Sequence, residues 1–456
     1  MKGYRKEKDS MGTVLVKNEN LWGAQTERSR TNFNIGQEEI PKSVIYALIS
    51  LKKAAANVNT TEGKLSSEQR DGILAACELL QTGEYEEQFP LKVWQTGSGT
   101  QTNMNVNEVI ACLSNKQFKN LGIHPNDHVN MSQSSNDVFP SAMHIAAYQA
   151  IHEQLLPECK RWIELLSEKE DRYRKTIKIG RTHLQDATPV TFGQEISGWR
   201  TMIKKAIQFI EESSKHLLCL AIGGTAVGTG INAPTAFGEK VAAEISQMYG
   251  YLFKEDENKF YALTSHSSLS NCHGSLRSLA GDLLKIANDI RWLASGPRCG
   301  IGEIKIPANE PGSSIMPGKV NPTQAEALTM IVAQVMGNDT TIQVAASQGN
   351  FQLNAFKPVV IFNFMQSITI LAEGMTSFRI HCLTDMEANS ERMEQSLHKS
   401  LMLVTALSPH IGYTKSAEIA KNAHDYNLNL RESALALGYA NESELDQWLD
   451  PKDMIH

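Results

Sequence analysis

The sequence lacks any grouping of its cysteines. Seven cysteines are scattered singly, with no Cys-x-x-Cys pair, and no His-Glu-x-x-His spacing occurs. Neither a disulfide framework nor a zinc site is therefore expected. We expect the cysteines to be reduced and buried as small hydrophobic residues. They are Cys77, Cys112, Cys159, Cys219, Cys272, Cys299 and Cys382.

Long runs of one charge and long apolar runs are also missing. The formal net charge is −6 and basic residues form no extended block, so nucleic acid and anionic lipid are not expected partners. Glycines interrupt the apolar stretch 217–231, which is shorter than the roughly 20 residues of a membrane-spanning helix. The first ten residues contain no apolar segment typical of a leader. These absences predict a cytoplasmic protein without a transmembrane segment.

What the sequence does have is the composition of a large globular protein with a helical pattern. Its 456 residues are 41% hydrophobic and 21% charged, which suggests roughly three domains. Hydrophobic residues recur at steps of three and four within 151–166, 196–210 and 276–293, as expected for long helices. The fold class predicted is mainly α. We place the domains at 1–134, 135–390 and 391–456, with a long-helix bundle as the central domain.

Polar connectors rich in Gly, Ser, Thr and Asn separate the helical patterns. We predict connectors at 96–107, 131–137, 223–232 and 307–322. Loops at the ends of rigid helices often carry functional groups.

The glycine-rich segments do not match nucleotide-binding loops. Gly312 to Lys319 has five residues between its two flanking glycines, and Val320 follows the lysine where a phosphate loop needs Ser or Thr. Gly228-Thr-Gly230 lacks the third glycine of a dinucleotide fingerprint. A nucleotide cofactor is therefore not expected.

The remaining loops offer hydroxyls, amides, Lys319 and His183, which suit a small dianionic substrate. Lysine and polar donors bind carboxylates, and histidine exchanges protons near neutral pH. Taken alone, His183 would more often be structural and Lys319 a solvated surface residue. Glu326 lies between Ala325 and Ala327, and a carboxylate on an apolar helix face needs a partner, for which a histidine is a candidate.

Gly312-Ser-Ser-Ile-Met-Pro-Gly-Lys-Val-Asn-Pro322 resembles the signature of the aspartase/fumarase superfamily. Further segments, at 94–103, 132–137, 180–187 and 223–230, resemble class II fumarases, so the likeness covers nearly the whole chain. Aspartate ammonia-lyases usually carry glutamine where this chain has His183, and the continuation Asn321 to Glu326 is also similar to the fumarase branch.

This resemblance implies a three-domain, mainly α-helical fold whose long helices form a twenty-helix core in a homotetramer. Each active site would take loops from three subunits. The implied activity is the reversible hydration of fumarate to L-malate in the tricarboxylic acid cycle, without a metal or cofactor.

The resemblance also implies roles for particular residues. Ser313, as an alkoxide stabilised by Lys319 and backbone amides, or alternatively His183, would remove the C3 proton of malate. His183, made more basic by Glu326, would protonate the departing hydroxyl. Lys319 and Asn321 would meet one substrate carboxylate. Further substrate hydrogen bonds would come from Ser98, Thr100, Ser134, Ser135 and Asn136, with supporting contacts from Thr182.

Some alternatives remain open on the sequence alone. A second dicarboxylate site is implied at His124, Asn126 and Asp127, but Leu121-Gly122-Ile123 precede it and the nearest lysine is Lys119, so we expect it to be weak. The nearest rival activity is an aspartate ammonia-lyase. The rival from another class is a non-catalytic protein that kept the fold.

Overall fold

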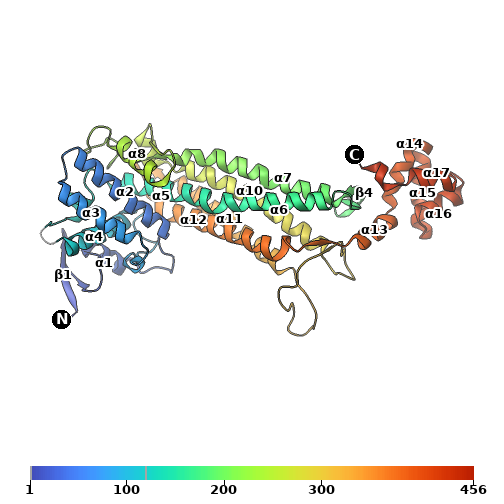
Figure 1. Ribbon diagram of the computed structural model, residues 1–456, viewed down its shortest axis with the longest axis horizontal. Coiled ribbons are helices and arrows are strands. Elements are labelled where there is room, and N and C mark those ends of the chain that lie inside the picture. Colours follow the sequence, from blue (N-terminus) through green and yellow to red (C-terminus); the bar gives the residue numbers. More distant parts are fainter. Residues whose placement is uncertain (1–2, 119–120, 456) are drawn as a thin grey trace. The chain divides into compact units, whose positions relative to one another are not determined.

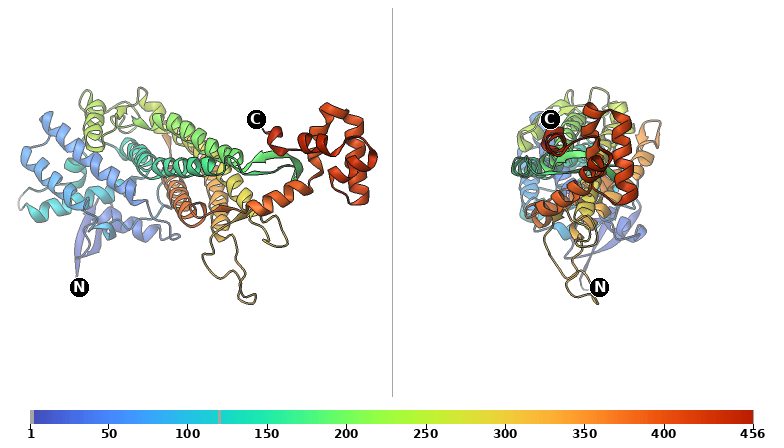
Figure 2. Two further views of the ribbon diagram at one scale, coloured as in Figure 1. Left: turned by 45° about the vertical axis from the view of Figure 1, so that its right-hand side comes forward. Right: turned by 90° about the vertical axis from the view of Figure 1, so that its right-hand side faces the viewer.

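The computed structural model describes residues 3–118 and 121–455, which are predominantly helical. The chain folds into two compact units (Figures 1 and 2). Unit 1 comprises Met1–Pro157, Ala206–Ala280 and Ala333–Ala372, and unit 2 comprises Glu158–Lys205, Gly281–Val332 and Glu373–His456. The predicted mainly α class is confirmed, and the three-domain boundaries stay a prediction.

Unit 1 is built around α2, which packs against α3, α5 and α8. Buried Val44, Leu48, Leu51 and Ala55 follow one another at steps of three and four along α2, so one stripe faces these neighbours. The elements of this unit are β1 (Tyr4–Asp9), β2 (Gly12–Lys17), α1 (Ala24–Asn32), α2 (Lys42–Thr61), α3 (Ser67–Leu80), α4 (Thr100–Gln117), α5 (Ser135–Ala150), β5 (Cys219–Leu220), α8 (Phe237–Tyr249), β6 (Lys254–Glu255), α9 (Lys259–Thr264), β8 (Gly349–Asn350) and β9 (Leu353–Asn354).

Five long helices contribute residues to both units. They are α6 (Leu156–Arg172), α7 (Phe192–Ser214), α10 (Ser267–Leu293), α11 (Thr323–Ala346) and α12 (Lys357–Phe378). The helices predicted from the apolar stripes in 196–210 and 276–293 are confirmed as α7 and α10. In the stripe of 151–166, a π-helical turn at Ile151–Leu155 precedes α6.

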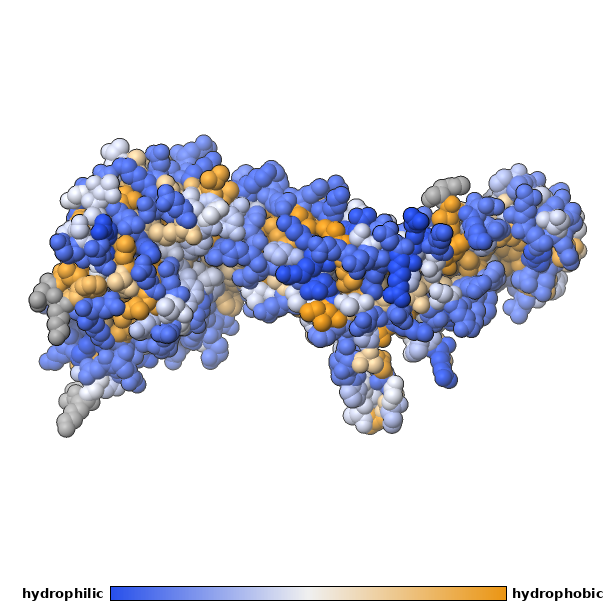
Figure 3. Space-filling view, in the orientation of Figure 1, coloured by the Kyte–Doolittle hydropathy of each residue, from blue (hydrophilic) through white to orange (hydrophobic). Residues whose placement is uncertain are grey.

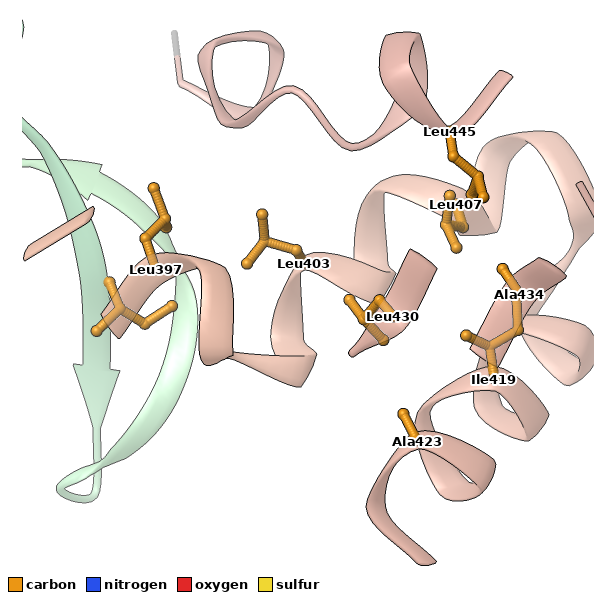
Figure 4. Packing of buried hydrophobic residues seen from close by; sticks show 9 residues of the cluster. Leu397, Leu403, Leu407, Ile419, Ala423, Leu430, Ala434 and Leu445 are labelled. Atoms are coloured by element: carbon orange, nitrogen blue, oxygen red, sulfur yellow. The ribbon is translucent and has the colours of Figure 1, made fainter. Parts of the chain in front are cut away.

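Unit 2 ends in a small helical cluster that packs against a β-hairpin. The hairpin is β3 (Ile177–Thr182) paired antiparallel with β4 (Gln185–Thr191). Ile179 of β3 belongs to the same buried cluster as Leu397, Leu403 and Leu407 (Figure 4). The remaining elements of this unit are β7 (Ile304–Lys305), β10 (Glu387–Ala388), α13 (Ser390–Lys399), α14 (Ser408–Ile411), α15 (Tyr413–Tyr426), α16 (Leu430–Leu437) and α17 (Glu442–Trp448).

Two of the predicted connectors are partly helical, so those two predictions are wrong in part. α4 already begins at Thr100 and α5 at Ser135. The Asn-rich composition of 96–107 was misleading because Asn103, Asn105 and Asn107 are buried within α4. The connectors at 223–232 and 307–322 contain no helix or strand.

The predictions for apolar stretches and cysteines also need correction. The segment Lys357–Leu383, not 217–231, is the one helix among the described residues long and apolar enough to cross a membrane, and half of its most apolar window is buried within this chain, as in a core helix. All seven cysteines are free, and Cys77, Cys159, Cys272 and Cys382 are buried as predicted. Cys299, in a loop, is exposed, and Cys219, at the start of β5, is half-buried. Cys112 is also half-buried although it lies within α4.

Candidate active site

The start of α5 gathers three of the predicted substrate-binding residues. Ser134 caps the helix by accepting a hydrogen bond from the Asn136 backbone N–H at 3.2 Å, while the Ser134 N–H donates to Asp137 Oδ1 at 2.9 Å. The other oxygen of Asp137 accepts from the N–H groups of Gly223 and Thr225. The positive end of a helix dipole and its free N–H groups make such a terminus suited to a carboxylate.

Asn103 joins this loop to the loop that carries Ser98 and Thr100. The Asn103 side chain donates to Ser135 Oγ at 3.1 Å, and it lies one turn into α4, which begins at Thr100. Ser98 Oγ and Thr100 Oγ1 are 2.8 Å apart. Gly99 has φ 77°, and a Cβ there would meet the Phe139 ring at 2.5 Å, so only glycine lets the two helix starts approach. Unit 1 therefore brings Ser98, Thr100 and the start of α5 together.

A buried lysine supports the same loop. The Lys52 side chain is fully buried and donates to Asn130 Oδ1 at 3.0 Å and to Gln133 Oε1 at 2.9 Å. Burial lowers the pKa of Lys52 to about 7, although Asp137 nearby favours its charged form. Burial likewise raises the pKa of Asp137 to about 6 against three backbone donors. Two ionisable groups thus lie under the Ser132–Asn136 loop with pKa values near neutrality.

In unit 2, the predicted catalytic histidine lies in the turn of the β3–β4 hairpin. His183 has φ 56° and Leu184 has φ 61°, the pair of left-handed conformations of a two-residue type I′ turn. For residues with a Cβ this costs roughly 1–2 kcal/mol each, and such strain persists where surrounding structure enforces it. Both side chains are exposed, so the hairpin presents His183 to whatever lies outside this chain.

Ser313 lies in the long segment between β7 and α11, which extends away from the helices (Figure 1). The Ser313 hydroxyl oxygen accepts hydrogen bonds from the backbone N–H groups of Ile315 at 3.2 Å and Met316 at 3.0 Å. The loop is closed by Gly312 N–H to Lys319 O at 2.8 Å and by the Asn321 side-chain amide to Gly312 O at 2.8 Å. Two donors aimed at one hydroxyl oxygen favour its anion.

Glu326 and Lys319 are exposed and do not reach His183 within one chain. Among residues 3–118 and 121–455, no hydrogen bond or ion pair joins Glu326 or Lys319 to His183. Glu326 lies in the first turn of α11, where the helix dipole favours an acid. Thr182, beside His183, is exposed as well.

His124, Asn126 and Asp127 are exposed at the start of a single π-helical turn, Pro125–Val129, of which His124 is the N-cap. His124 Nδ1 accepts from the backbone N–H groups of Asn126 and Asp127, at 3.3 and 3.2 Å. These two amides are thus already occupied, and Lys119 lies outside the described residues. His128 follows four residues after His124, a spacing that sequence reasoning missed. Its Nδ1 accepts from the His124 N–H, and no group of three or more His, Cys, Asp or Glu in the described residues is arranged to hold a metal ion.

Four residues of this arrangement were not singled out from the sequence. Asn103 and Asp137 lie within the segments 94–103 and 132–137, and the family resemblance of these segments could have identified them. Lys52, one of two adjacent lysines in a largely apolar helical stretch, was a weaker signal. Glu303, described below, carried no sequence signal because its importance comes from residues more than a hundred positions away.

Comparison with known protein families finds two matches on this chain. A family model described as lyase matches residues 12–337, and one described as fumarase C C-terminus matches residues 403–456. The first match alone covers more than half of the chain.

Similar proteins extend this likeness over the full length. The chain is 59% identical over 452 residues to a fumarate hydratase class II of Listeria monocytogenes and 57% identical over 455 residues to one of Staphylococcus haemolyticus, covering 99% of each chain in both cases. The crystal structure of a class II fumarase from Schistosoma mansoni aligns with a TM-score of 0.97 at 40% identity, covering 99% of both chains.

Proposed function

Because this chain belongs to the class II fumarate hydratase family, we propose that it catalyses the reversible hydration of fumarate to L-malate. The observation that carries the proposal is the full-length similarity at 59% identity, together with His183 in the turn of the hairpin, where ammonia-lyases of the superfamily usually differ. The substrate is a small dicarboxylate. The reaction is proposed to need no metal or cofactor.

One substrate carboxylate would bind where the starts of α4 and α5 meet. Ser98, Thr100, Ser134, Ser135 and Asn136 provide hydroxyl, amide and backbone donors there, and the hydrogen bonds of Asn103 and Asp137 hold them in place. Donors that are already oriented need no reorganisation when charge builds up on the carboxylate during C–H cleavage.

Ser313 would remove the C3 proton. A serine hydroxyl is a weak base in water, and the two N–H donors from Ile315 and Met316 support its deprotonated form. Lys319 and Asn321 would meet one substrate carboxylate. One of the two N–H donors of Asn321 Nδ2 already closes the loop onto Gly312 O, so its contribution to substrate would come from the second N–H, which can donate to a carboxylate.

His183 would protonate the hydroxyl that leaves malate, or activate water in the hydration direction. Its proposed partner Glu326 has no contact with it inside one chain, which supports pairing between different chains. Large hydrophobic side chains also stay exposed on the long helices, among them Phe209, Trp292, Met330 and Val344, and Figure 3 shows hydrophobic patches amid the hydrophilic surface. Exposed patches of this kind mark interfaces. We therefore propose a homotetramer in which three subunits supply each site.

A turnover assay tests this function. Purified protein is given L-malate or L-aspartate, and fumarate is followed by its ultraviolet absorbance, before and after treatment with a chelator. Fumarate from malate alone, undiminished by the chelator, is the expected result. Product from aspartate alone would assign the chain to the ammonia-lyases, and product from neither would favour a non-catalytic protein.

Two further assignments complete the proposal. The turn at His124 would bind a second dicarboxylate only weakly, since the amides of Asn126 and Asp127 are occupied. The protein is proposed to act in the cytoplasm. Cell fractionation with the turnover assay tests the location, and calorimetric titration with malate of a variant inactive at the main site tests the second binding event.

A further inference from the structure

A buried carboxylate in unit 2 holds the hairpin that carries His183. The Glu303 side chain is fully buried and receives two hydrogen bonds from one guanidinium: Arg181 Nη1 donates to Oε2 at 3.0 Å and Nη2 to Oε1 at 2.7 Å. Lys178, also on β3, lies 3.3 Å from Oε2 and 3.0 Å from Glu195. Two cations therefore meet two carboxylates, and the buried charges are balanced.

Arg181 is well placed to fix the turn. It stands two residues before His183, and the pairing of β3 with β4 shifts register between Ile179 and Arg181, a β-bulge. Beyond the bulge only Arg181 with Asp186 and Thr182 with Gln185 remain paired before the turn. A bulge re-aims the strand that follows it. The bidentate contact with Glu303 is the side-chain anchor nearest to the strained turn.

The backbone of Glu303 is hydrogen-bonded through both its N–H and its carbonyl, just before the chain enters the Ser313 loop. Its N–H donates to Leu293 O at 2.8 Å, and its carbonyl accepts from the Asn389 N–H at 2.8 Å. The next two residues form β7, which pairs with β10. The chain then enters the long loop that carries Ser313. One side chain thus connects the two segments of unit 2 that carry the proposed acid and the proposed base.

We propose that the Arg181–Glu303 pair is a positioning device that fixes the direction of the His183 hairpin on the backbone of its own chain, so that His183 reaches the site it shares with the loops of other subunits. This inference rests on the proposed function. The pair touches no reacting atom and acts through the placement of His183. A misplacement of about 1 Å in a reacting group can cost about 100-fold in rate, so the pair should control turnover more than substrate affinity.

The test uses two variants. Arg181→Lys keeps the positive charge but loses the bidentate contact, and Glu303→Gln keeps the side-chain shape but loses the negative charge. Both are assayed as assembled protein recovered from size-exclusion chromatography. We expect kcat to fall about 10- to 100-fold while KM changes less than about threefold.

Glu158→Gln is the matched control. Glu158 is another buried carboxylate of unit 2 with a bidentate arginine, since Arg379 donates to Oε1 at 2.6 Å and to Oε2 at 3.3 Å. Its ion-pair partners Arg161 and Arg379 belong neither to the hairpin nor to the Ser313 loop. This variant should lower the unfolding temperature and keep kcat.

The outcomes separate the inference from the function. If Arg181→Lys keeps kcat within about threefold of wild type, the pair is structural and the inference is wrong; this variant decides alone if Glu303→Gln does not assemble. An equal fall of kcat in Glu158→Gln would also overturn it. His183→Asn is measured alongside: if that variant keeps full activity, the role of His183 in the proposed function fails instead.

Discussion

The two units differ in the burial and hydrogen bonding of the residues that are proposed to act on substrate. In unit 1, Ser98, Ser134, Ser135 and Asn136 are buried or half-buried and hydrogen-bonded to their own chain. In unit 2, the described side chains of His183, Lys319 and Glu326 are exposed, and no hydrogen bond or ion pair joins them to one another. One chain therefore hydrogen-bonds its proposed binding groups by itself, and in the proposed tetramer other subunits would complete its proton-transfer groups.

This difference has a physical reason. Groups that bind carboxylates work best when fixed in advance, and helix starts inside one compact unit fix them. A catalytic acid and base must lie on opposite sides of a small substrate, so they fit on protruding segments such as the hairpin and the Ser313 loop. In the proposed tetramer, assembly would close the site, and activity should therefore depend on it.

The largest effects should come from the proton-transfer groups of unit 2. His183→Asn and Ser313→Ala should each lower kcat by about 10²- to 10⁴-fold, because each removes a proposed proton-transfer group. Thermal unfolding and tetramer content should stay near wild type, since neither side chain is buried. Steady-state kinetics with size-exclusion chromatography measures both. Near-normal turnover of Ser313→Ala would leave His183 as the C3 base.

Mixing two inactive variants would test whether the start of α5 and the His183 hairpin of one chain contribute to different active sites. Asn136→Asp places a negative charge at the start of α5 and should repel the dicarboxylate, while His183→Asn lacks the acid. If the two loops at each site come from different subunits, exchange of subunits should restore about a quarter of wild-type activity. No recovery after verified exchange would mean that both loops at a site come from the same chain.

The buried lysine of unit 1 should give stability a distinctive pH dependence. Lys52 has a pKa of about 7 in the fold against an ordinary value of 10.5, so above pH 7 the unfolded chain binds the extra proton and stability from this group rises with pH. Relative to Lys52→Met, wild type should gain about 2 kcal/mol between about pH 7 and about pH 9. Denaturant unfolding at the two pH values measures this difference. A pH-independent difference would show that Lys52 does not titrate in this range.

The smallest effect is expected from an exposed helix cap in unit 1. Ser66 caps α3 by accepting from the Gln69 N–H, in a reciprocal capping box. Ser66→Ala should lower the free energy of unfolding by about 1 kcal/mol and leave kcat and KM unchanged. A clear change in KM would indicate that small stability losses in unit 1 reach the carboxylate-binding loops, contrary to their proposed rigidity.

Much of the helical architecture could be predicted from the sequence, because the apolar stripes of α7 and α10 report burial directly. The start of α4 could not be predicted, since Asn103 and Asn107 look like loop residues until tertiary packing buries them. The exposure of Cys299 was likewise missed, because composition alone does not reveal which residues neighbours cover. The apolar length of the segment Lys357–Leu383 was a readable signal, but its burial in the fold was not.

The sequence by itself determined the helical class, the family likeness and the choice of His183, Ser313, Lys319 and Glu326 as candidates, because these depend on local pattern and on residue type. Only the tertiary structure decided that Lys52 lies buried under the binding loop and that Glu303 holds Arg181. Such contacts join residues through folding, and the burial and direction that give them their energy do not exist in the linear chain.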